Sequence, residues 1–432
     1  MPFNNEQHHD VHLNLNVRCL SQSATLAINE HCANLHNEGR DVYRMGLGQS
    51  PFPVASQVVD ELKANAHQKD YLPVKGLPQL REAVANYHRR QENVEYSRED
   101  VLIGPGSKEL MFLIQLVYYG DLVIPTPSWV SYAPQATIIG RHIRWVPTRL
   151  EDGWRITPEE LDSLCRPDPT RPRILILNYP NNPSGTTYSD DQLQALAAVA
   201  RRYKIILLSD EIYGETTFSG QHRSIARYYP EGTIISAGLS KWCGAGGWRL
   251  GTFTFPRSLR WLLDAVAVVA SETFTSTSAP IQHAAVSAYE GSIEIEHYLL
   301  NSRRILKSLG TRLAGRLQQA GVDLPIPEGG FYLFASFGKY RERLAEQGIT
   351  TSKEFCRRLL EETGVAILPG CDFGCPPGEL TARMAFVDFD GARALVSAKE
   401  IPINEELPDD FTDRHCARVV SGVNHLCDWL GQ

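Results

Sequence analysis

Residues 236–251 read SAGLSKWCGAGGWRLG, and they connect two short apolar runs that predict β-strands. The first run is TIISAGLSK (233–241) and the second is RLGTFTF (249–255). The connection between them is rich in glycine and carries two cations, Lys241 and Arg249. The stretch therefore places charged side chains near the end of a strand, which is where open α/β proteins bind ligands.

On the N-terminal side of this stretch, short apolar runs alternate with amphipathic helical patterns. The predicted strands cover residues 101–103, 122–124, 174–177 and 205–213. The predicted helices cover residues 110–119 and 190–203, with Ser189 placed to cap the second. This alternation predicts an α/β fold, with a mostly parallel sheet flanked by helices.

The pattern changes from about residue 310 onward, where helices and short apolar runs predict a smaller α+β domain joined by the N-terminal segment. The expected elements are helices at 306–320 and 352–363 and apolar runs at 331–337, 365–370 and 382–389. We predict three parts: an N-terminal arm with part of the small domain (1–60), a large domain (61–305) and a small C-terminal domain (306–432).

Composition narrows the classes of function. The 432 residues include 43 Lys and Arg against 50 Asp and Glu, which gives a net charge of −7 at pH 7. No nucleic-acid partner is expected, because phosphate binding needs a clustered basic face. No membrane span is expected, because no run of about 18 apolar residues occurs. The first residues lack the apolar core of a signal peptide, so we expect a cytoplasmic protein.

Residues that commonly bind metals form no pattern typical of a metal site. Nine cysteines are scattered along the chain, and the close pair Cys371 and Cys375 has no histidine or second pair at zinc-like spacing. We therefore expect packed, reduced thiols and no metal. His8 and His9 are interpreted as part of a polar tail.

Polar and aromatic residues follow several predicted strands. They are Gly106, Ser107, Lys108, Trp129, Asn182, Asp210, Tyr213, Ser240, Lys241 and Arg249. Because strand ends of an open sheet share one edge, we expect these residues to lie close together. One carboxylate, one phenol, one amide, one indole and three cations suit a phosphorylated, electron-withdrawing ring.

Each of these residues also has an ordinary structural interpretation. Lys241 could be a solvated loop charge, or an amine whose pKa is lowered by nearby cations. Asp210 could cap a turn, or keep a ring nitrogen protonated. Tyr213 and Trp129 could be packing aromatics, and a glycine-rich turn at 104–108 is only a weak sign of anion binding. Their joint placement favours the functional interpretation.

These residues resemble a known family, the class I/II aminotransferases, which are fold-type I pyridoxal phosphate enzymes. The resemblance covers roughly residues 25–430. Its three central blocks are NYPNNPSG (178–185), SDEIY (209–213) and residues 236–251. Flanking blocks are similar at residues 39–53, 71–87, 327–334, 365–374 and 381–386.

The resemblance implies a cofactor, pyridoxal 5′-phosphate, bound by the large domain. Lys241 would form a Schiff base with it and move the substrate proton, Asp210 would pair with the ring nitrogen, and Tyr213 with Asn182 would hold the ring oxygen. Trp129 would stack on the ring. The phosphate would be held by Gly106, Ser107, Lys108, Ser240 and Arg249, and by Tyr71 across the interface of a homodimer.

The resemblance also implies the substrates, an L-amino acid and a 2-oxo acid that react in two half-reactions (ping-pong). Arg383 would bind the α-carboxylate, aided by Asn182 and the backbone near Gly48. Two departures stand out. Gly238 occupies a position where some members have a phosphate-binding serine, and no arginine matches the one that binds a second carboxylate. The apolar helix after Lys108 favours neutral or aromatic substrates.

Other functions remain open, both among pyridoxal phosphate enzymes and among proteins that are not enzymes. The same residues would serve a pyridoxal phosphate-dependent C–S lyase or another bond-cleaving enzyme of the same fold. A cofactor-binding regulatory protein is disfavoured, because no DNA-binding helical domain or basic patch is evident. An inactive relative is disfavoured, because Lys241, Asp210, Arg249 and Arg383 are all present.

Overall fold

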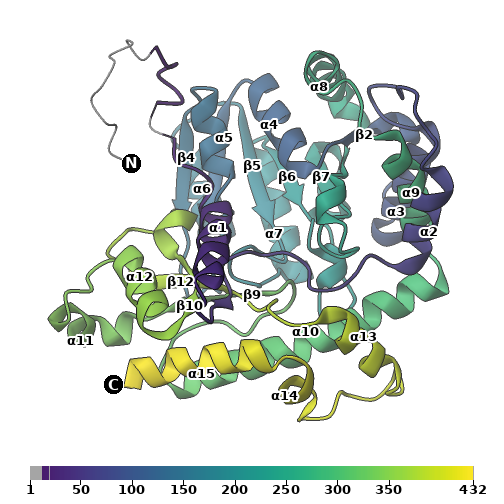
Figure 1. Ribbon diagram of the computed structural model, residues 1–432. Coiled ribbons are helices and arrows are strands. Elements are labelled where there is room, and N and C mark those ends of the chain that lie inside the picture. The colour runs from purple at the N-terminus through teal and green to yellow at the C-terminus, as the bar shows by residue number, and fades with distance from the viewer. Residues whose placement is uncertain (1–11, 19, 432) are drawn as a thin grey trace.

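A seven-stranded sheet forms the centre of the protein, whose computed structural model describes residues 12–18 and 20–431 (Figure 1). In spatial order the strands are β2 (Val101–Gly104), β8 (Gly251–Thr254), β7 (Thr233–Gly238), β6 (Ile206–Asp210), β5 (Arg173–Asn178), β3 (Asp121–Thr126) and β4 (Ile143–Pro147). Neighbouring strands are parallel except where β8 pairs with β2 and β7. The predicted mostly parallel α/β sheet is confirmed.

The sheet lies inside the protein because its apolar residues alternate between two cores. In β5, Ile174 and Ile176 belong to one core, and Leu175 and Leu177 belong to the other. The first core is closed by α4 (Ser107–Val117), α5 (Tyr132–Ile138) and α8 (Arg260–Thr273). The second is closed by α6 (Pro158–Cys165) and α7 (Asp190–Arg202). Helices therefore flank both faces, as predicted.

Two features of the sheet were not predicted. The edge strand β4 reads IRWVP and is half-exposed, so it lacks the continuous apolar run that marks its neighbours. The strand β8 runs antiparallel to β7. Its start therefore lies at the edge where the parallel strands end, and this places Arg249 beside the residues that follow those strands.

The C-terminal part forms a smaller α+β unit around α10 (Ile293–Gln319) and a three-stranded sheet. The strands are β11 (Leu368–Pro369), β12 (Thr381–Ala385) and β9 (Tyr332–Ser336). The helices are α11 (Arg341–Glu346), α12 (Ser352–Thr363), α13 (Gly391–Lys399), α14 (Phe411–His415) and α15 (Ala417–Gly431). Figure 1 shows α10 and α15 packed side by side below the large sheet.

The N-terminal segment joins this smaller unit, as expected. It begins with α1 (Ala24–Asn37), and β1 (Tyr43–Arg44) then pairs in parallel with β10 (Val365–Ala366). The chain next forms α2 (Ser56–Asn65) and α3 (Pro78–Glu92), which pack against α9 (Ala279–Glu290).

Three of the four predicted helices, which correspond to α4, α7 and α12, begin and end within about three residues of the prediction. Ser189 caps α7 by accepting a bond from the backbone N–H of Gln192, as predicted. The helix predicted at 306–320 is much longer, because Ser292 caps α10 at its start. The predicted boundary between residues 305 and 306 thus falls inside α10, and the domain limits stay a prediction.

Neither a membrane-spanning helix nor a metal cluster occurs in the described part of the chain. Over residues 12–18 and 20–431, no helix is long and apolar enough to cross a membrane. Within those same ranges, no group of three or more His, Cys, Asp or Glu side chains could hold a metal ion. The cysteines of these ranges are free thiols, and all but Cys371 are buried. Cys19 and the pair His8 and His9 lie outside the described residues.

Candidate active site

The residues predicted from the strand ends meet in one cavity of about 470 Å³. Its lining includes Gly48, Ser107, Lys108, Trp129, Asn182, Asp210, Tyr213, Ser240, Lys241, Arg249 and Arg383. Gly106 lies directly behind this lining, against Arg249. Tyr71 is the exception: it is 89% exposed and does not line the cavity. The structure therefore brings the predicted residues together, apart from Tyr71, which was expected to act across a dimer interface, and their roles stay a prediction.

Lys241 lies inside the cavity with its amine held in place. Its Nζ donates a hydrogen bond to the carbonyl of Gly48 at 2.8 Å and lies 5.6 Å from the ring centroid of Tyr213. Burial, with the neighbouring cations Arg383 and Arg249, lowers the pKa of Lys241 to about 8. Near neutral pH a useful fraction of this amine is thus unprotonated and can attack an aldehyde.

Asp210 ends β6 and is 3% exposed. Its Oδ2 accepts a hydrogen bond from the hydroxyl of Tyr132 at 2.6 Å, and its Oδ1 accepts one from Ser236 at 3.4 Å. Burial raises the pKa of Asp210 to about 6, although these hydrogen bonds oppose the rise. Such a carboxylate is suited to pair with a cationic ring nitrogen, which would stabilise its charged form.

Arg383, on β12, is 1% exposed and is held on several sides. One end of its guanidinium donates to Oδ1 of Asn182 at 3.1 Å, and the other donates to the carbonyl of Gly46. The group lies 4.7 Å from the ring centroid of Tyr332. Its Nε has no hydrogen-bond partner although it is buried. A rigid guanidinium with a spare donor can bind a carboxylate.

The start of α4 forms a corner whose chemistry suits an anion. Gly106 precedes this helix with φ of +92°, and a Cβ there would lie 2.0 Å from Nη2 of Arg249. Only glycine allows the arginine this close to the free backbone N–H groups of the helix N-terminus. Those N–H groups, the helix dipole and the Arg249 charge all favour a phosphate here.

Three residues of this site were not identified from the sequence. Tyr132 and Ser236 bind Asp210, and Tyr332 donates to or accepts from the hydroxyl of Tyr213 at 2.7 Å. Tyr132 lies three residues after Trp129, so the run PSWVSY held a signal for it. Tyr332 belongs to PEGGFYLF, a block whose role the sequence pattern left unassigned. Thr25 and Leu26 of α1 also line the cavity.

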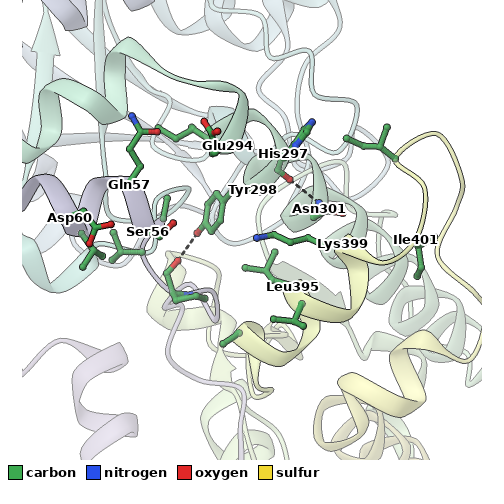
Figure 2. A pocket seen from close by; sticks show the side chains of 18 of the residues that line it. Ser56, Gln57, Asp60, Glu294, His297, Tyr298, Asn301, Leu395, Lys399 and Ile401 are labelled. Atoms are coloured by element: carbon green, nitrogen blue, oxygen red, sulfur yellow. Dashed lines mark hydrogen bonds between the residues drawn. The ribbon is translucent and has the colours of Figure 1, made fainter.

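A larger cavity of about 870 Å³ lies between α2, the first turns of α10, and α13 (Figure 2). Figure 2 shows Tyr298 and Lys399 reaching into it from α10 and α13. Much of its wall is aliphatic, with Ile295 and Leu395 as examples. None of the predicted site residues lines it, so the smaller cavity is the candidate active site.

Comparisons with known proteins identify the family of this chain. The family described as "Aminotransferase class I and II" matches residues 39–397. An aspartate aminotransferase of Geobacillus stearothermophilus is 34% identical over 370 residues, which cover 83% of this chain and 91% of that protein. An asparagine–oxo-acid transaminase of Streptococcus mutans is 29% identical over 370 residues, with the same two coverages.

Solved structures give the same picture. An aspartate aminotransferase from Thermus thermophilus with maleate matches this fold with a TM-score of 0.80. It is 28% identical in sequence, and the match covers 90% of this chain and 98% of that one.

Proposed function

The chain belongs to the class I and II aminotransferases, and we propose that it moves the amino group of an L-amino acid to a 2-oxo acid with pyridoxal 5′-phosphate held at Lys241. The chain is a transaminase by its family; the cofactor-binding residues and the substrates are the proposal. One observation carries it: Lys241, Asp210 and Arg383, which come from distant parts of the sequence, line one cavity.

The residues of the cavity fit this cofactor. Gly106 leaves room for the guanidinium of Arg249 at the N-terminus of α4, which suits a phosphate, and Asp210 is a buried carboxylate in the lining of the cavity. The unpartnered Nε of Arg383 remains for a substrate carboxylate. When bound, pyridoxal phosphate supplies a ring that withdraws electrons from the α-carbon of the amino acid.

Each residue then has a stated task. The Lys241 amine would bind the aldehyde carbon until the amino acid displaces it, and the freed amine would then carry the proton between two carbon atoms, which its pKa of about 8 permits near neutral pH. Asp210 keeps the ring nitrogen protonated, and Trp129 packs on the ring face. Tyr213 and Asn182 hold the ring oxygen. The phosphate is bound by Gly106, Ser107, Ser240 and Arg249.

Arg383 orients the substrate through its α-carboxylate. Its guanidinium is fixed by Asn182 and by the carbonyl of Gly46, so the donor that binds the carboxylate is already in position. Gly48 contributes backbone at the same wall and leaves room for Tyr332, because a Cβ there would lie 1.9 Å from the Tyr332 hydroxyl.

We propose a dicarboxylic amino donor of the aspartate class. The apolar helix α4 alone favours a neutral side chain, but the cavity holds one cation more than the aldehyde, the phosphate and the α-carboxylate require. That cation is Lys108, whose Nζ lies 5.1 Å from the Trp129 ring centroid. We assign it to the second carboxylate rather than to the phosphate. The relatives named for aspartate support this choice.

We also propose that the enzyme works as a cytoplasmic homodimer. Tyr71 is almost fully exposed in the single chain, although its sequence block predicts a phosphate contact. In a dimer, Tyr71 of one copy would contact the phosphate site of the other copy. Free, buried thiols in the described ranges fit a reducing compartment.

Borohydride trapping tests the proposal directly. The purified holoenzyme is reduced and digested, and its peptides are mapped by mass; a pyridoxyl group on Lys241 is expected, and Lys241→Ala should carry none. The wild type should convert more than one equivalent of aspartate per subunit only when a 2-oxo acid is supplied. Release of pyruvate, ammonia and a thiol from a β-thioether amino acid, without any acceptor, would instead identify the rival lyase.

A further inference from the structure

Two buried carboxylates follow one another at the end of β6 and face opposite sides of the sheet. Asp210 lines the candidate active site, and Glu211 lines a separate cavity of about 80 Å³. Successive residues of an extended chain point in opposite directions, so this arrangement follows from the strand itself. The transamination proposed above gives no task to Glu211.

Glu211 is held more firmly than its neighbour. One carboxylate oxygen lies 2.8 Å from Nε2 of His222, and the other accepts hydrogen bonds from Ser224 at 2.5 Å and from Ser209 at 2.7 Å. Burial alone would raise the pKa of Glu211, but His222 and these hydroxyls lower it overall. The carboxylate form of Glu211 is therefore favoured, and its hydrogen bonds fix one side-chain orientation.

Further ionisable groups surround the pair. Glu92 is buried beside Arg227 and accepts from the backbone N–H of Ser224, while Glu215 bonds to Arg303. Two ring nitrogens, Nε2 of His88 and Nδ1 of His222, are buried without a hydrogen-bond partner. The cavity that these side chains line is large enough and polar enough for ordered water.

The backbone transmits this anchoring to Asp210. The N–H of Glu211 donates to the carbonyl of Ser236 at 2.8 Å, and the carbonyl of Asp210 accepts from Nδ2 of Asn178 at 2.8 Å. The peptide that joins the two acidic residues is thus tied to both neighbouring strands. If Glu211 loses its hydrogen bonds on one side of the sheet, the Asp210 carboxylate on the other side should turn away from Tyr132.

We propose that Glu211 and His222 form a positioning pair that holds the end of β6 and thereby aims the Asp210 carboxylate at the ring nitrogen. This inference rests on the proposed function, because it assumes the role given there to Asp210. The pair touches neither substrate nor cofactor and acts only through Asp210.

Charge-neutral variants test the pair. Glu211→Gln and His222→Gln should each weaken pyridoxal phosphate binding and lower kcat about tenfold, because a hydrogen bond to a charged group is lost. The KM for the amino donor should change less than about twofold, because Arg383 is untouched. In the apoprotein, amide hydrogen exchange of residues 205–213 should be faster. The double variant should lose no more than either single variant.

Glu215→Gln is the matched control, because Glu215 lines the same cavity but bonds to Tyr87 and Arg303 rather than to the end of β6. It should lower thermal stability without changing cofactor affinity or exchange at 205–213. If it weakens the cofactor as much as Glu211→Gln does, the role is general packing and the positioning pair is refuted.

A milder variant keeps the test decisive if Glu211→Gln does not fold. Ser224→Ala removes one donor to Glu211 and should weaken cofactor binding in the same direction, by about threefold. If the wild type binds the cofactor and the folded variants keep their cofactor affinity, kcat and hydrogen exchange unchanged, the positioning role of Glu211 and His222 is refuted. A wild type that binds no pyridoxal phosphate refutes the proposed function instead.

Discussion

The hydroxyl groups of Tyr213 and Tyr332 lie 2.7 Å apart and connect the large sheet to the small one. Tyr213 follows β6, and Tyr332 begins β9. The ring of Tyr332 also supports the guanidinium of Arg383 at 4.7 Å. One tyrosine thus contacts both Arg383, the proposed carboxylate-binding residue, and Tyr213, a proposed cofactor-binding residue.

Two substitutions of Tyr332 should separate the contribution of its ring from the contribution of its hydroxyl. Tyr332→Leu removes the aromatic face beneath Arg383, and we expect the KM for the amino donor to rise about tenfold, as a desolvated cation–π contact predicts. Tyr332→Phe keeps that face and should raise the KM less than about threefold. Steady-state kinetics of both variants check this. Equal KM values in the two variants would mean that the ring does not support Arg383.

Tyr132 should set the acidic limit of cofactor binding. Burial raises the pKa of Asp210 and the Tyr132 hydrogen bond holds it down, so Tyr132→Phe should raise that pKa further in the apoprotein. The carboxylate is then lost at a higher pH, and the acidic limb of the pH profile of cofactor affinity should move upward, with about a tenfold loss near pH 6. Ser236→Ala, which removes a longer bond of 3.4 Å, should shift the profile less. An unmoved acidic limb in Tyr132→Phe contradicts this account.

Capture of the cofactor by apoprotein should speed up as the pH rises through about 8, because the Lys241 amine must lose its proton before it attacks. Arg383 is one of the cations that lower this pKa. Arg383→Gln should therefore raise the pKa and slow capture at pH 7. Stopped-flow absorbance across pH 6 to 10 measures the midpoint. The surface variant Arg418→Gln is the control and should leave the pH midpoint of capture unchanged. An unchanged midpoint in Arg383→Gln would show that Arg383 does not lower the pKa of Lys241.

Lys108 should distinguish substrates with one carboxylate from those with two. Lys108→Met removes the charge assigned to the second carboxylate, so the KM for aspartate should rise about tenfold while that for alanine changes little. Cofactor affinity, followed by fluorescence, should stay near the wild-type value. A loss of cofactor affinity with equal effects on both donors would return Lys108 to the phosphate role predicted from the sequence.

The backbone at Gly106 should be intolerant of any side chain. Gly106→Ala places a Cβ 2.0 Å from Arg249 at a left-handed φ, so the arginine must move and the cofactor should bind about tenfold more weakly. Gly247 also lines the cavity, but a Cβ at that residue would have no other atom within 4 Å. Gly247→Ala is the control and should keep normal affinity, as measured by cofactor titration. Equal affinity in both alanine variants would show that the corner holds no phosphate.

The sequence predicted which residues share the cavity better than it predicted the contacts among them. Short apolar runs identified the central strands, and strand ends then located Lys241 and Asp210, because the carboxyl ends of parallel strands share an edge. β4 was missed because an edge strand needs no continuous apolar run. Tyr332 was missed because it lies 119 residues from Tyr213, and only the folded chain brings the two together.

The antiparallel direction of β8 affects which sequence changes the cavity can tolerate. Because the chain turns back at once, residues 239–250 carry both Lys241 and Arg249, and one short loop fixes the spacing between these two proposed cofactor contacts. α1 supplies Thr25 and Leu26 to the cavity and no proposed cofactor contact. Substitutions on α1 can therefore alter the wall of the cavity without touching a proposed cofactor contact, whereas an insertion between 239 and 250 would change the spacing between two of them.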